Sequence, residues 1–300
     1  MDVKPYLQIE DQLQLLKNRG LCIDDEDEAI DILHQLNYYR LSGYMLTLKK
    51  GDRFYKNVHF SDIMQIYYFD KELKGAMLFW LEDIEVALRT HIAYILGKRG
   101  STSYLDVSNF ASDVHHSDFL KELKSALSDN KNEAFVKHHI TKYGGTLPVW
   151  VVVETLSFGA VSRLFTALGN DIKGEICEQY YYGIPPKYIE NWLECLVVVR
   201  NLCAHHARLF NRGLPKAVKF SRQEFSYIVD NGGYDSNAVG KKLFFPVIIL
   251  DRLSPLSSAR FRDTFQTLRE KYPFVDIKHY GFLNNWEFIL DDINKNYFPG

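Results

Sequence analysis

Apolar residues along this chain recur at intervals of three and four positions, the spacing that places them on one face of a helix. The longest such stretch is Asp62–Lys98, for which Ser61 is the expected N-cap and Gly75 an expected kink or division. A second stretch, Val149–Leu168, is largely apolar and predicts one buried helix. The strand signal is confined to a turn at 49–52, which indicates a short hairpin. These patterns predict an all-α fold.

Glycine, proline and acidic residues mark where the other helices begin and end. Gly20 follows one helix at the position that needs a left-handed backbone, and the acidic run Asp24–Glu28 opens the next, where it complements the helix dipole. Trp80 and Trp150, on the most apolar helices, are expected in the core. Further helices are expected at Glu10–Arg19, Asp118–Ser128, Asn132–Lys142, Lys173–Tyr182, Lys242–Leu250, Ser257–Lys271 and Leu283–Asn294.

One predicted helix, Asn191–Arg212 with the sequence NWLECLVVVRNLCAHHARLFNR, carries a polar stripe on an otherwise apolar surface. Because an α-helix turns by about 100° per residue, the polar side chains of this stripe fall close to one line along the helix. Arg200 lies one residue away from that line, next to Asn201. Such a stripe is costly unless it meets water or a charged ligand. The residues of the stripe are Glu190, Glu194, Asn201, His205, Arg208 and Arg212.

Positive charge is concentrated in and after this helix. Between Cys195 and Gln223 there are six Lys or Arg residues and no Asp or Glu, whereas the whole chain has a formal net charge of −2. A local cationic excess favours an anion, and a polyanion such as RNA can make several of these contacts at once. RNA is therefore the expected partner, and the expected RNA-binding residues outside the helix are Lys216, Lys219 and Arg222.

Composition and motif content argue against several other classes of protein. The four cysteines are too few and too scattered for a disulfide scaffold, and they indicate reduced thiols in a cytoplasmic protein. The N-terminus lacks the basic start and apolar run of a signal peptide, and no apolar run approaches the roughly 18 residues of a membrane span. Cys195 and Cys203 are poorly placed to share a zinc ion with His205 and His206. The motifs of phosphate loops, dinucleotide sites and zinc proteases are also absent from the sequence.

The same helix resembles a known group of ribonucleases. Arg200 and His205 are spaced as in the R-x(4–6)-H motif of HEPN ribonucleases, and RNLCAHHARLFNR resembles the C-terminal signature of the Abi-like (AbiD/AbiF) abortive-infection proteins. Four more stretches resemble that family, so the resemblance covers most of the chain. They are NYYRLSGY (Asn37–Tyr44), YYFDKELK with IEVALRTHI behind it (Tyr67–Ile92), LPVWVVVETLSFGAVSRLF (Leu147–Phe165) and YGFLNNWE (Tyr280–Glu287). The last of them, YGFLNNWE, is similar to a degenerate form of the family's Met-Gly-Phe-Pro…Trp ending.

The resemblance implies both a fold and an activity. The fold is a HEPN-like helical bundle with additional N- and C-terminal helices, divided into an N-terminal helical module (1–60) and a main domain (61–300). The activity is that of a metal-independent endoribonuclease without a cofactor, an abortive-infection or toxin-like effector controlled by a structured noncoding RNA. In that reaction the RNA 2′-hydroxyl attacks the adjacent phosphate and leaves a 2′,3′-cyclic phosphate. Arg200 would stabilise the phosphorane, His205 would move protons, and Asn201 would orient His205 or hold a phosphate oxygen.

Several alternatives stay open from the residues alone. His206, about 100° from His205 around the helix, is the second candidate for the catalytic histidine. Arg89 either pairs with Glu85 four residues away or contacts the site from a neighbouring helix. The cluster also fits a catalytically silent RNA-binding module, a set of ordinary buried ion pairs, or a toxin that a nucleotidyltransferase modifies. The residues expected to support the site are His206, Arg208 and Arg212.

The chain contains one match to the R-x(4–6)-H motif, whereas the resemblance implies that two motifs meet across a helical interface. A single histidine would have to serve as both acid and base unless a second chain supplies another. Twofold pairing is the commonest symmetry of soluble oligomers. We therefore expect a homodimer in which the two Arg200–His205 helix ends face each other.

Overall fold

The structure is a computed structural model that describes residues 5–297, with the side chains of 255–258 left out. Its fold is all-α, which confirms the predicted class, and the strands in the described residues form one short hairpin of β1 (Lys49–Lys50) and β2 (Arg53–Phe54). The described residues also form the short 3-10 helices η1 (Ser103–Leu105), η2 (Val107–Asn109) and η3 (Ile277–Tyr280). The α-helices are α1 (Ile9–Asn18), α2 (Glu26–Gln35), α3 (Tyr38–Ser42), α4 (Phe60–Arg99), α5 (Asp113–Asp129), α6 (Ala134–Tyr143), α7 (Val149–Thr155), α8 (Phe158–Ala167), α9 (Asn170–Tyr180), α10 (Pro186–Ala204), α11 (Arg222–Asp230), α12 (Phe244–Leu253), α13 (Pro255–Lys271) and α14 (Trp286–Asn296).

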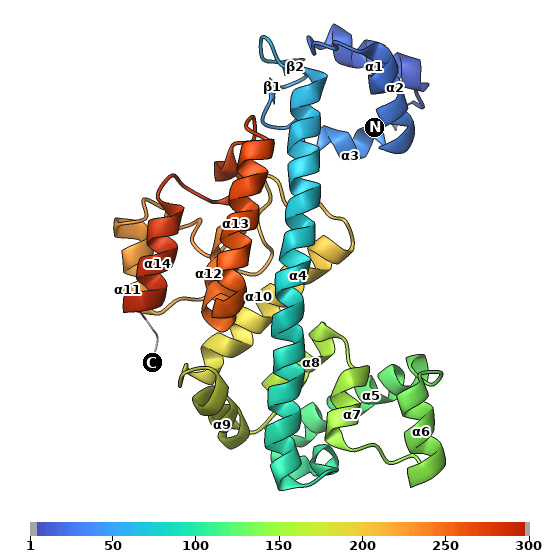
Figure 1. The fold of residues 1–300 in the computed structure, drawn as a ribbon, viewed down its shortest axis with the longest axis vertical. Coiled ribbons are helices and arrows are strands. Elements are labelled where there is room, and N and C mark those ends of the chain that lie inside the picture. The colour runs from blue at the N-terminus through green and yellow to red at the C-terminus, as the bar shows by residue number, and fades with distance from the viewer. Residues whose placement is uncertain (1–4, 298–300) are drawn as a thin grey trace.

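Helix α4 forms the axis of the molecule. It is 40 residues long, about 60 Å at 1.5 Å per residue. In Figure 1, α1–α3 lie at its N-terminal end, α5–α9 gather near its C-terminal half, and α10 crosses it near the middle. One apolar core runs from Leu13 to Ile293, and the division of the chain at residue 60 stays a prediction. None of the helices in the described part of the chain is both long enough and apolar enough to cross a bilayer.

The start of α4 differs from the expectation in one detail. The helix begins at Phe60, and the cap is His59, whose backbone N–H donates to the carboxylate of Asp62 at 2.8 Å. The expectation of Ser61 as N-cap is therefore wrong, because Ser61 already lies in the first turn. Gly75 is exposed and does not divide the helix, which continues through it.

The apolar stretch after residue 148 forms two helices rather than the single helix that was expected. Helix α7 ends at Thr155, and the side chain of Ser157 accepts a hydrogen bond from the backbone of Ala160, which starts α8 in a new direction. This serine cap competes with helix continuation and outweighs the uniform hydropathy around it. Trp80 is buried as expected, but Trp150 is 52% exposed, so its placement in the core is wrong.

Helix α11 was not predicted, although its start carries a local signal. Ser221 and Glu224 form a capping box in which each side chain binds the other residue's backbone N–H. Glu224 is completely buried, and it also accepts from the equally buried guanidinium of Arg252 at 2.6 Å. Burial lowers the pKa of Arg252, and the carboxylate of Glu224 opposes that effect. This pair fixes α11 against α12.

A half-buried histidine joins α4 to α9. The ring of His91 stacks on Tyr180 with 3.9 Å between the ring centroids and lies 3.2 Å from the hydroxyl of Tyr181. Burial lowers the pKa of His91 to about 4 from its ordinary value of 6.5. The folded protein therefore holds this imidazole neutral where the unfolded chain would already be protonated.

We expect this histidine to make the protein acid-sensitive. The contribution of His91 to stability is complete above about pH 6.5 and is lost as the pH falls toward 4, because the unfolded state then binds the extra proton. Melting temperatures measured across this range should fall less steeply for His91→Gln than for the wild type. His34→Gln, at an exposed position on α2, is the control and should follow the wild-type profile. Parallel profiles for His91→Gln and the wild type would contradict the assignment.

Candidate functional site

Helix α10 carries the candidate catalytic residues and ends earlier than the sequence predicts. The expectation of one helix over Asn191–Arg212 is wrong beyond Ala204, where α10 ends. The expected line of polar side chains stops there, so Arg208 and Arg212 lie in the following loop rather than on the helix. His205 occupies the C-cap position. The site is therefore a helix end with a loop, not a continuous stripe.

The helix is stopped by a Schellman turn without glycine. The backbone N–H of His206 donates to the carbonyl of Cys203 at 3.1 Å, and that of Ala207 donates to the carbonyl of Leu202 at 2.8 Å. His206 adopts the left-handed conformation (φ 55°) that this turn requires. Histidine is one of the few residues other than glycine that are enriched in this conformation, but it still carries a backbone cost there.

Arg200 lies between the end of α10 and the middle of α4. Its guanidinium donates to the amide oxygen of Asn201 at 3.1 Å and lies 3.5 Å from a carboxylate oxygen of Glu85. The Arg200 side chain is 31% exposed, whereas that of Glu85 is 13% exposed. The guanidinium is thus held by protein on one side and reaches solvent on the other. Sequence reasoning did not identify Glu85 as part of this site.

Arg89 makes the first of the two contacts that the sequence left open, the pair with Glu85, and it reaches Arg200 only through that carboxylate. Its guanidinium pairs with Glu85, four residues earlier on α4, and donates to the carbonyl of Leu156 at 2.9 Å. That carbonyl is free to accept because α7 has already ended. Since Glu85 also contacts Arg200, Arg89 belongs to the same network of charges.

His205 is the most open member of the group. Its residue is exposed, and its backbone N–H donates to the carbonyl of Asn201 at 2.9 Å. Among residues 5–297 no side chain makes a hydrogen bond to its ring, so the imidazole is available to a ligand. Arg200, Asn201 and His205 therefore come together at one partly open helix end, as expected, while their catalytic roles stay a prediction.

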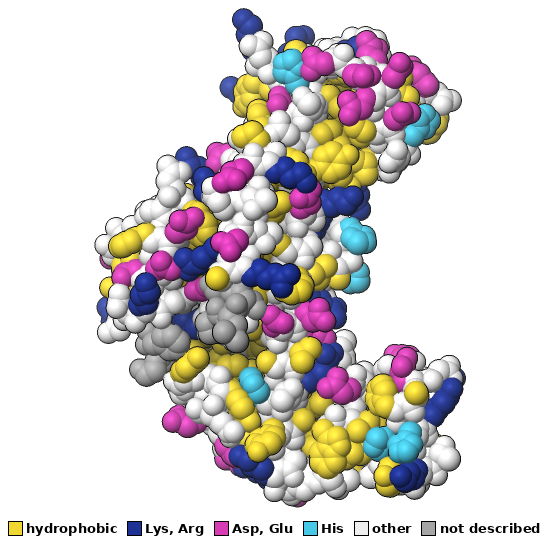
Figure 2. Space-filling model, viewed as in Figure 1, with side chains coloured by type: hydrophobic (Ala, Val, Ile, Leu, Met, Phe, Trp, Pro, Cys, Tyr) yellow, Lys and Arg dark blue, Asp and Glu magenta, His cyan; other side chains and the backbone are white. Residues whose placement is uncertain are grey.

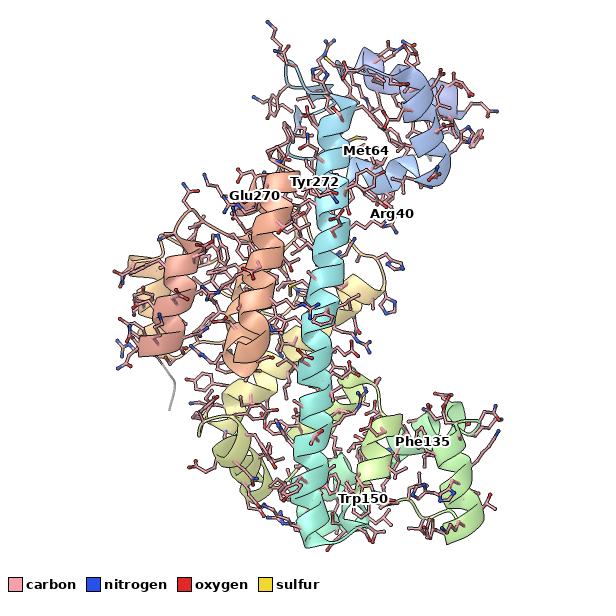
Figure 3. All side chains as sticks on the ribbon, in the orientation of Figure 1. Arg40, Met64, Phe135, Trp150, Glu270 and Tyr272 are labelled. Atoms are coloured by element: carbon pink, nitrogen blue, oxygen red, sulfur yellow. The ribbon has the colours of Figure 1, made fainter. Side chains whose placement is uncertain are left out.

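The loop after α10 is tied to other parts of the chain through its backbone. Arg40, from α3, donates to the carbonyl of His206 at 2.8 Å, and Lys74, from α4, lies 3.3 Å from the carbonyl of Ala207. Figure 3 shows Arg40 beside α4 at the end that faces this loop. On the viewed surface, histidine and basic side chains gather along this edge of the molecule, above the hollow beside α5–α7 (Figure 2).

Arg208 has a structural partner rather than an open position. Its guanidinium donates to the carbonyl of Gly43 at 2.8 Å. A Cβ at residue 43 would lie only 3.0 Å from the Nε atom of Arg208, so a glycine gives this side chain room to pass. The supporting role expected of Arg208 is therefore to join the loop to the segment after α3.

A buried carboxylate holds the loop in place. Asp70 lies on α4, is completely buried, and faces donors from four separate parts of the chain. Burial and the neighbouring Asp70 carboxylate raise the pKa of the Tyr280 hydroxyl well above its ordinary value, so this hydroxyl stays protonated and donates. The donors to Asp70 are the backbone N–H groups of Leu209 (3.1 Å) and Phe210 (2.8 Å), the hydroxyls of Tyr44 (2.9 Å) and Tyr280 (3.1 Å), and Lys74 (3.2 Å).

The stretches that suggested a family resemblance meet at this place. Asn37–Tyr44 supplies Arg40, Gly43 and Tyr44, and the α4 stretch supplies Asp70, Lys74, Glu85 and Arg89. The stretch at 147–165 supplies the carbonyl of Leu156, and the last stretch supplies Tyr280. Residues from distant parts of the sequence therefore build one support for the end of α10.

The basic residues after the loop lie on a segment that runs alongside α10. The chain turns back along α10, so that the carbonyl of Lys216 faces Cys195 and the backbone of Lys219 binds Asn191. These contacts lie about 8 to 14 Å from Arg200 along the helix. The ammonium of Lys216 pairs with Glu194 at 2.5 Å, whereas Lys219 and Arg222 are exposed. Their RNA-binding role stays a prediction.

The cysteines near the site are buried thiols. Burial raises the pKa of both Cys195 and Cys203 to about 12, which keeps them protonated and unreactive. Within residues 5–297, no three His, Cys, Asp or Glu side chains are grouped so that they could hold a metal ion.

Variants at His206 separate its backbone role from any chemical role. We expect His206→Gly to melt at or above the wild-type temperature, and His206→Ala to be less stable than His206→Gly by about 1 kcal/mol, because alanine is strained at this φ. Thermal melting of both variants measures the difference. If His205 is the catalytic histidine, His206→Gly also keeps activity toward RNA. Loss of activity in a folded His206→Gly variant would instead assign the chemistry to His206.

Comparison with known proteins adds one finding. The family model described as Abi-like protein matches residues 31–211, a range that begins in α2 and ends in the loop after α10. It thus includes Arg40, Asp70, Glu85 and the Arg200–His205 segment. No curated protein and no solved structure matches the chain.

Proposed function

This chain belongs to the Abi-like protein family, which suggests a role in abortive infection, and from that premise we propose that it is a metal-independent endoribonuclease. The observation that carries the proposal is the juxtaposition of Arg200, Asn201 and an exposed His205 at one rigidly supported helix end. Arginine can give two parallel hydrogen bonds to a phosphate, and histidine exchanges protons near neutral pH. Together they supply what cleavage of RNA through its own 2′-hydroxyl requires.

In the proposed reaction the RNA provides the nucleophile. The 2′-oxygen forms a bond to the adjacent phosphorus, the bond from phosphorus to the 5′-oxygen breaks, and a 2′,3′-cyclic phosphate and a 5′-hydroxyl result. One imidazole accepts the proton of the 2′-hydroxyl, and a protonated group donates to the departing 5′-oxygen. Arg200 stabilises the negative charge of the phosphorane. Glu85 and Asn201 hold the guanidinium in place before RNA binds.

The first experiment asks whether the protein cleaves RNA or only binds it. Purified protein is incubated with end-labelled RNA in EDTA, and binding and cleavage are followed in the same samples. Cleavage in EDTA supports the proposal. Binding without cleavage under any activating condition would favour the second candidate, a catalytically silent RNA-binding module that uses the same exposed His205 and Arg200. A structured noncoding RNA as regulator, which the family resemblance implies, would appear as nucleic acid that copurifies with the protein.

A homodimer would complete the proposed reaction. Each chain offers one exposed His205, so two facing helix ends would supply one imidazole as base and a second as acid. The repulsion between the clustered cations would be relieved by bound RNA. Light scattering with and without RNA tests the assembly, and mixed Arg200→Ala and His205→Ala chains should regain part of the activity if the residues act in trans. A monomer that cleaves RNA would contradict the shared site.

A further inference from the structure

A cavity of about 490 Å³ lies between the last turns of α4 and the helix α7. Its walls include two aromatic residues, Tyr94 and Trp150, and two cations, Arg89 and Lys98. Figure 3 shows Trp150 next to the C-terminal part of α4, whereas α1–α3 lie at the opposite end of that helix. None of these residues except Arg89 takes part in the site described above.

The aromatic rings in this cavity are unusually open. Trp150 is 52% exposed and Tyr94 is 58% exposed, although Val149 and the three valines after Trp150 on α7 are buried. The indole is nevertheless positioned: a Cβ at Gly97 would lie 3.9 Å from its Cε3 atom, an ordinary contact distance, so the ring edge rests on α4. An indole that is supported at its edge and open elsewhere is a platform on which a planar group can stack.

The charges around the platform suit one base of a nucleic-acid strand. The Lys98 side chain is 47% exposed and can reach a phosphate; its ammonium lies 5.3 Å from the centroid of the Tyr94 ring and 3.3 Å from a carboxylate oxygen of Glu175. Arg89 also lines the cavity, but its guanidinium is already bound to Glu85 and to the carbonyl of Leu156. Glu154 also lines the cavity and is exposed, and a carboxylate accepts hydrogen bonds from the amino groups of bases. An acyl chain would gain nothing from Lys98 and Glu154, whereas a nucleotide can use both of them.

Arg89 connects this cavity to the end of α10. It lines the cavity and also pairs with Glu85, which in turn contacts Arg200. Tyr94 lies nine residues beyond Glu85 on the same helix, about 14 Å farther along its axis and about half a turn around it. A strand whose phosphate is held by Arg200 would therefore pass partly around α4 to reach the cavity, with Arg89 between the two places.

We propose that the Tyr94–Trp150 cavity is a base-binding subsite for the RNA strand held at Arg200. The proposal rests on the proposed function, because that function identifies the ligand as RNA. The subsite adds a stacking contact with one base of the strand, on one side of the cleaved bond. Stacking of this kind is tolerant of sequence, since every base presents a flat face.

Tryptophan fluorescence reports on this subsite directly. The chain has four tryptophans, and Trp80, Trp192 and Trp286 are at most 3% exposed, so Trp150 is the one that a ligand can reach. Full-length His205→Ala protein keeps the RNA uncut during the titration. A short single-stranded RNA should quench the fluorescence of this protein, and the added change Trp150→Phe should remove most of the quenching. An abasic strand of the same length should bind without quenching.

Affinity gives the second readout. Fluorescence anisotropy of a labelled RNA should show Kd raised roughly tenfold by Trp150→Ala, and raised less by Trp150→Phe, which keeps a flat ring. Phe288→Ala removes a 63% exposed aromatic residue from α14 and should leave Kd unchanged. Thermal melting confirms that each variant is folded.

The outcomes separate this proposal from the proposed function. RNA that binds with unchanged Kd and unchanged fluorescence in the Trp150 variants would overturn the subsite and leave the ribonuclease proposal standing. RNA that binds through Trp150 but is never cleaved would support the subsite and overturn the ribonuclease. Quenching by adenosine monophosphate alone, with no effect of Trp150→Ala on strand binding, would overturn the assignment to a strand. A change in oligomeric state with unchanged RNA affinity would assign Trp150 to a protein interface and overturn it too.

Discussion

Replacing Asp70 with alanine is expected to lower the free energy of unfolding by roughly 3–5 kcal/mol. The carboxylate is completely buried and accepts from two backbone N–H groups and two tyrosine hydroxyls, and it pairs with Lys74. Alanine would leave the two N–H groups and the two hydroxyls buried without this acceptor, and it would leave the buried Lys74 without its carboxylate partner. Urea unfolding and thermal melting measure the loss, and the melting temperature should fall by at least about 5 °C.

Two further variants identify the cause of that loss. Asp70→Asn keeps the shape of the side chain, but its NH₂ group is a donor and would face the donors that surround Asp70. This variant should therefore also be less stable than the wild type. Asp52→Ala removes a carboxylate that is 77% exposed and lies 3.4 Å from Arg19, and it should melt close to the wild type. A wild-type melting temperature for Asp70→Ala would show that this carboxylate does not hold the loop after α10.

The second large effect is expected on cleavage rather than on stability. His205→Ala and Arg200→Ala should each reduce the rate of RNA cleavage by at least about 100-fold, since one removes proton transfer and the other removes stabilisation of the phosphorane. Both should melt close to the wild type. His205 is exposed, and Glu85 keeps its pairing with Arg89 when Arg200 is lost. Rates are measured with a labelled RNA in EDTA.

Matched surface variants control for loss of charge alone. His34→Ala on α2 and Arg53→Ala on the hairpin remove an exposed histidine and an exposed arginine far along the chain from α10. They should cleave RNA at the wild-type rate. A large fall in melting temperature for Arg200→Ala or His205→Ala would instead support the reading in which these residues form ordinary structural pairs.

Long periodic helices could be predicted from the sequence, and their ends could not. Helix α4 was placed to within two residues at its start and one at its end, because its period persists over many turns. The end of α10 was missed because His206 adopts the left-handed conformation in which a glycine is the usual signal. The break before α8 was missed because the cap, Ser157, lies inside an otherwise apolar run.

In the candidate site, too, the local contacts could be predicted from the sequence and the long-range contacts could not. Arg200, Asn201 and His205 are neighbours in sequence, so helical spacing was enough to bring them together. The contacts of Asp70 with Phe210 and Tyr280 join residues 140 and 210 positions apart, and no local pattern specifies them. An aspartate on the apolar face of a predicted helix was the available signal, because such a residue must find buried donors. The path of the chain after residue 212 could not be predicted, because its reversal along α10 is also a long-range feature.

The chemical ends of the cleavage products test the central claim most directly. Wild-type protein and His205→Ala are each incubated in EDTA with an RNA and with the same RNA carrying 2′-deoxy sugar at the cleaved position. We predict 2′,3′-cyclic phosphate and 5′-hydroxyl ends from the wild type on the unmodified RNA alone. Cleavage of the 2′-deoxy substrate, products with 3′-hydroxyl and 5′-phosphate ends, or full activity of His205→Ala would contradict a ribonuclease built on Arg200, Asn201 and His205.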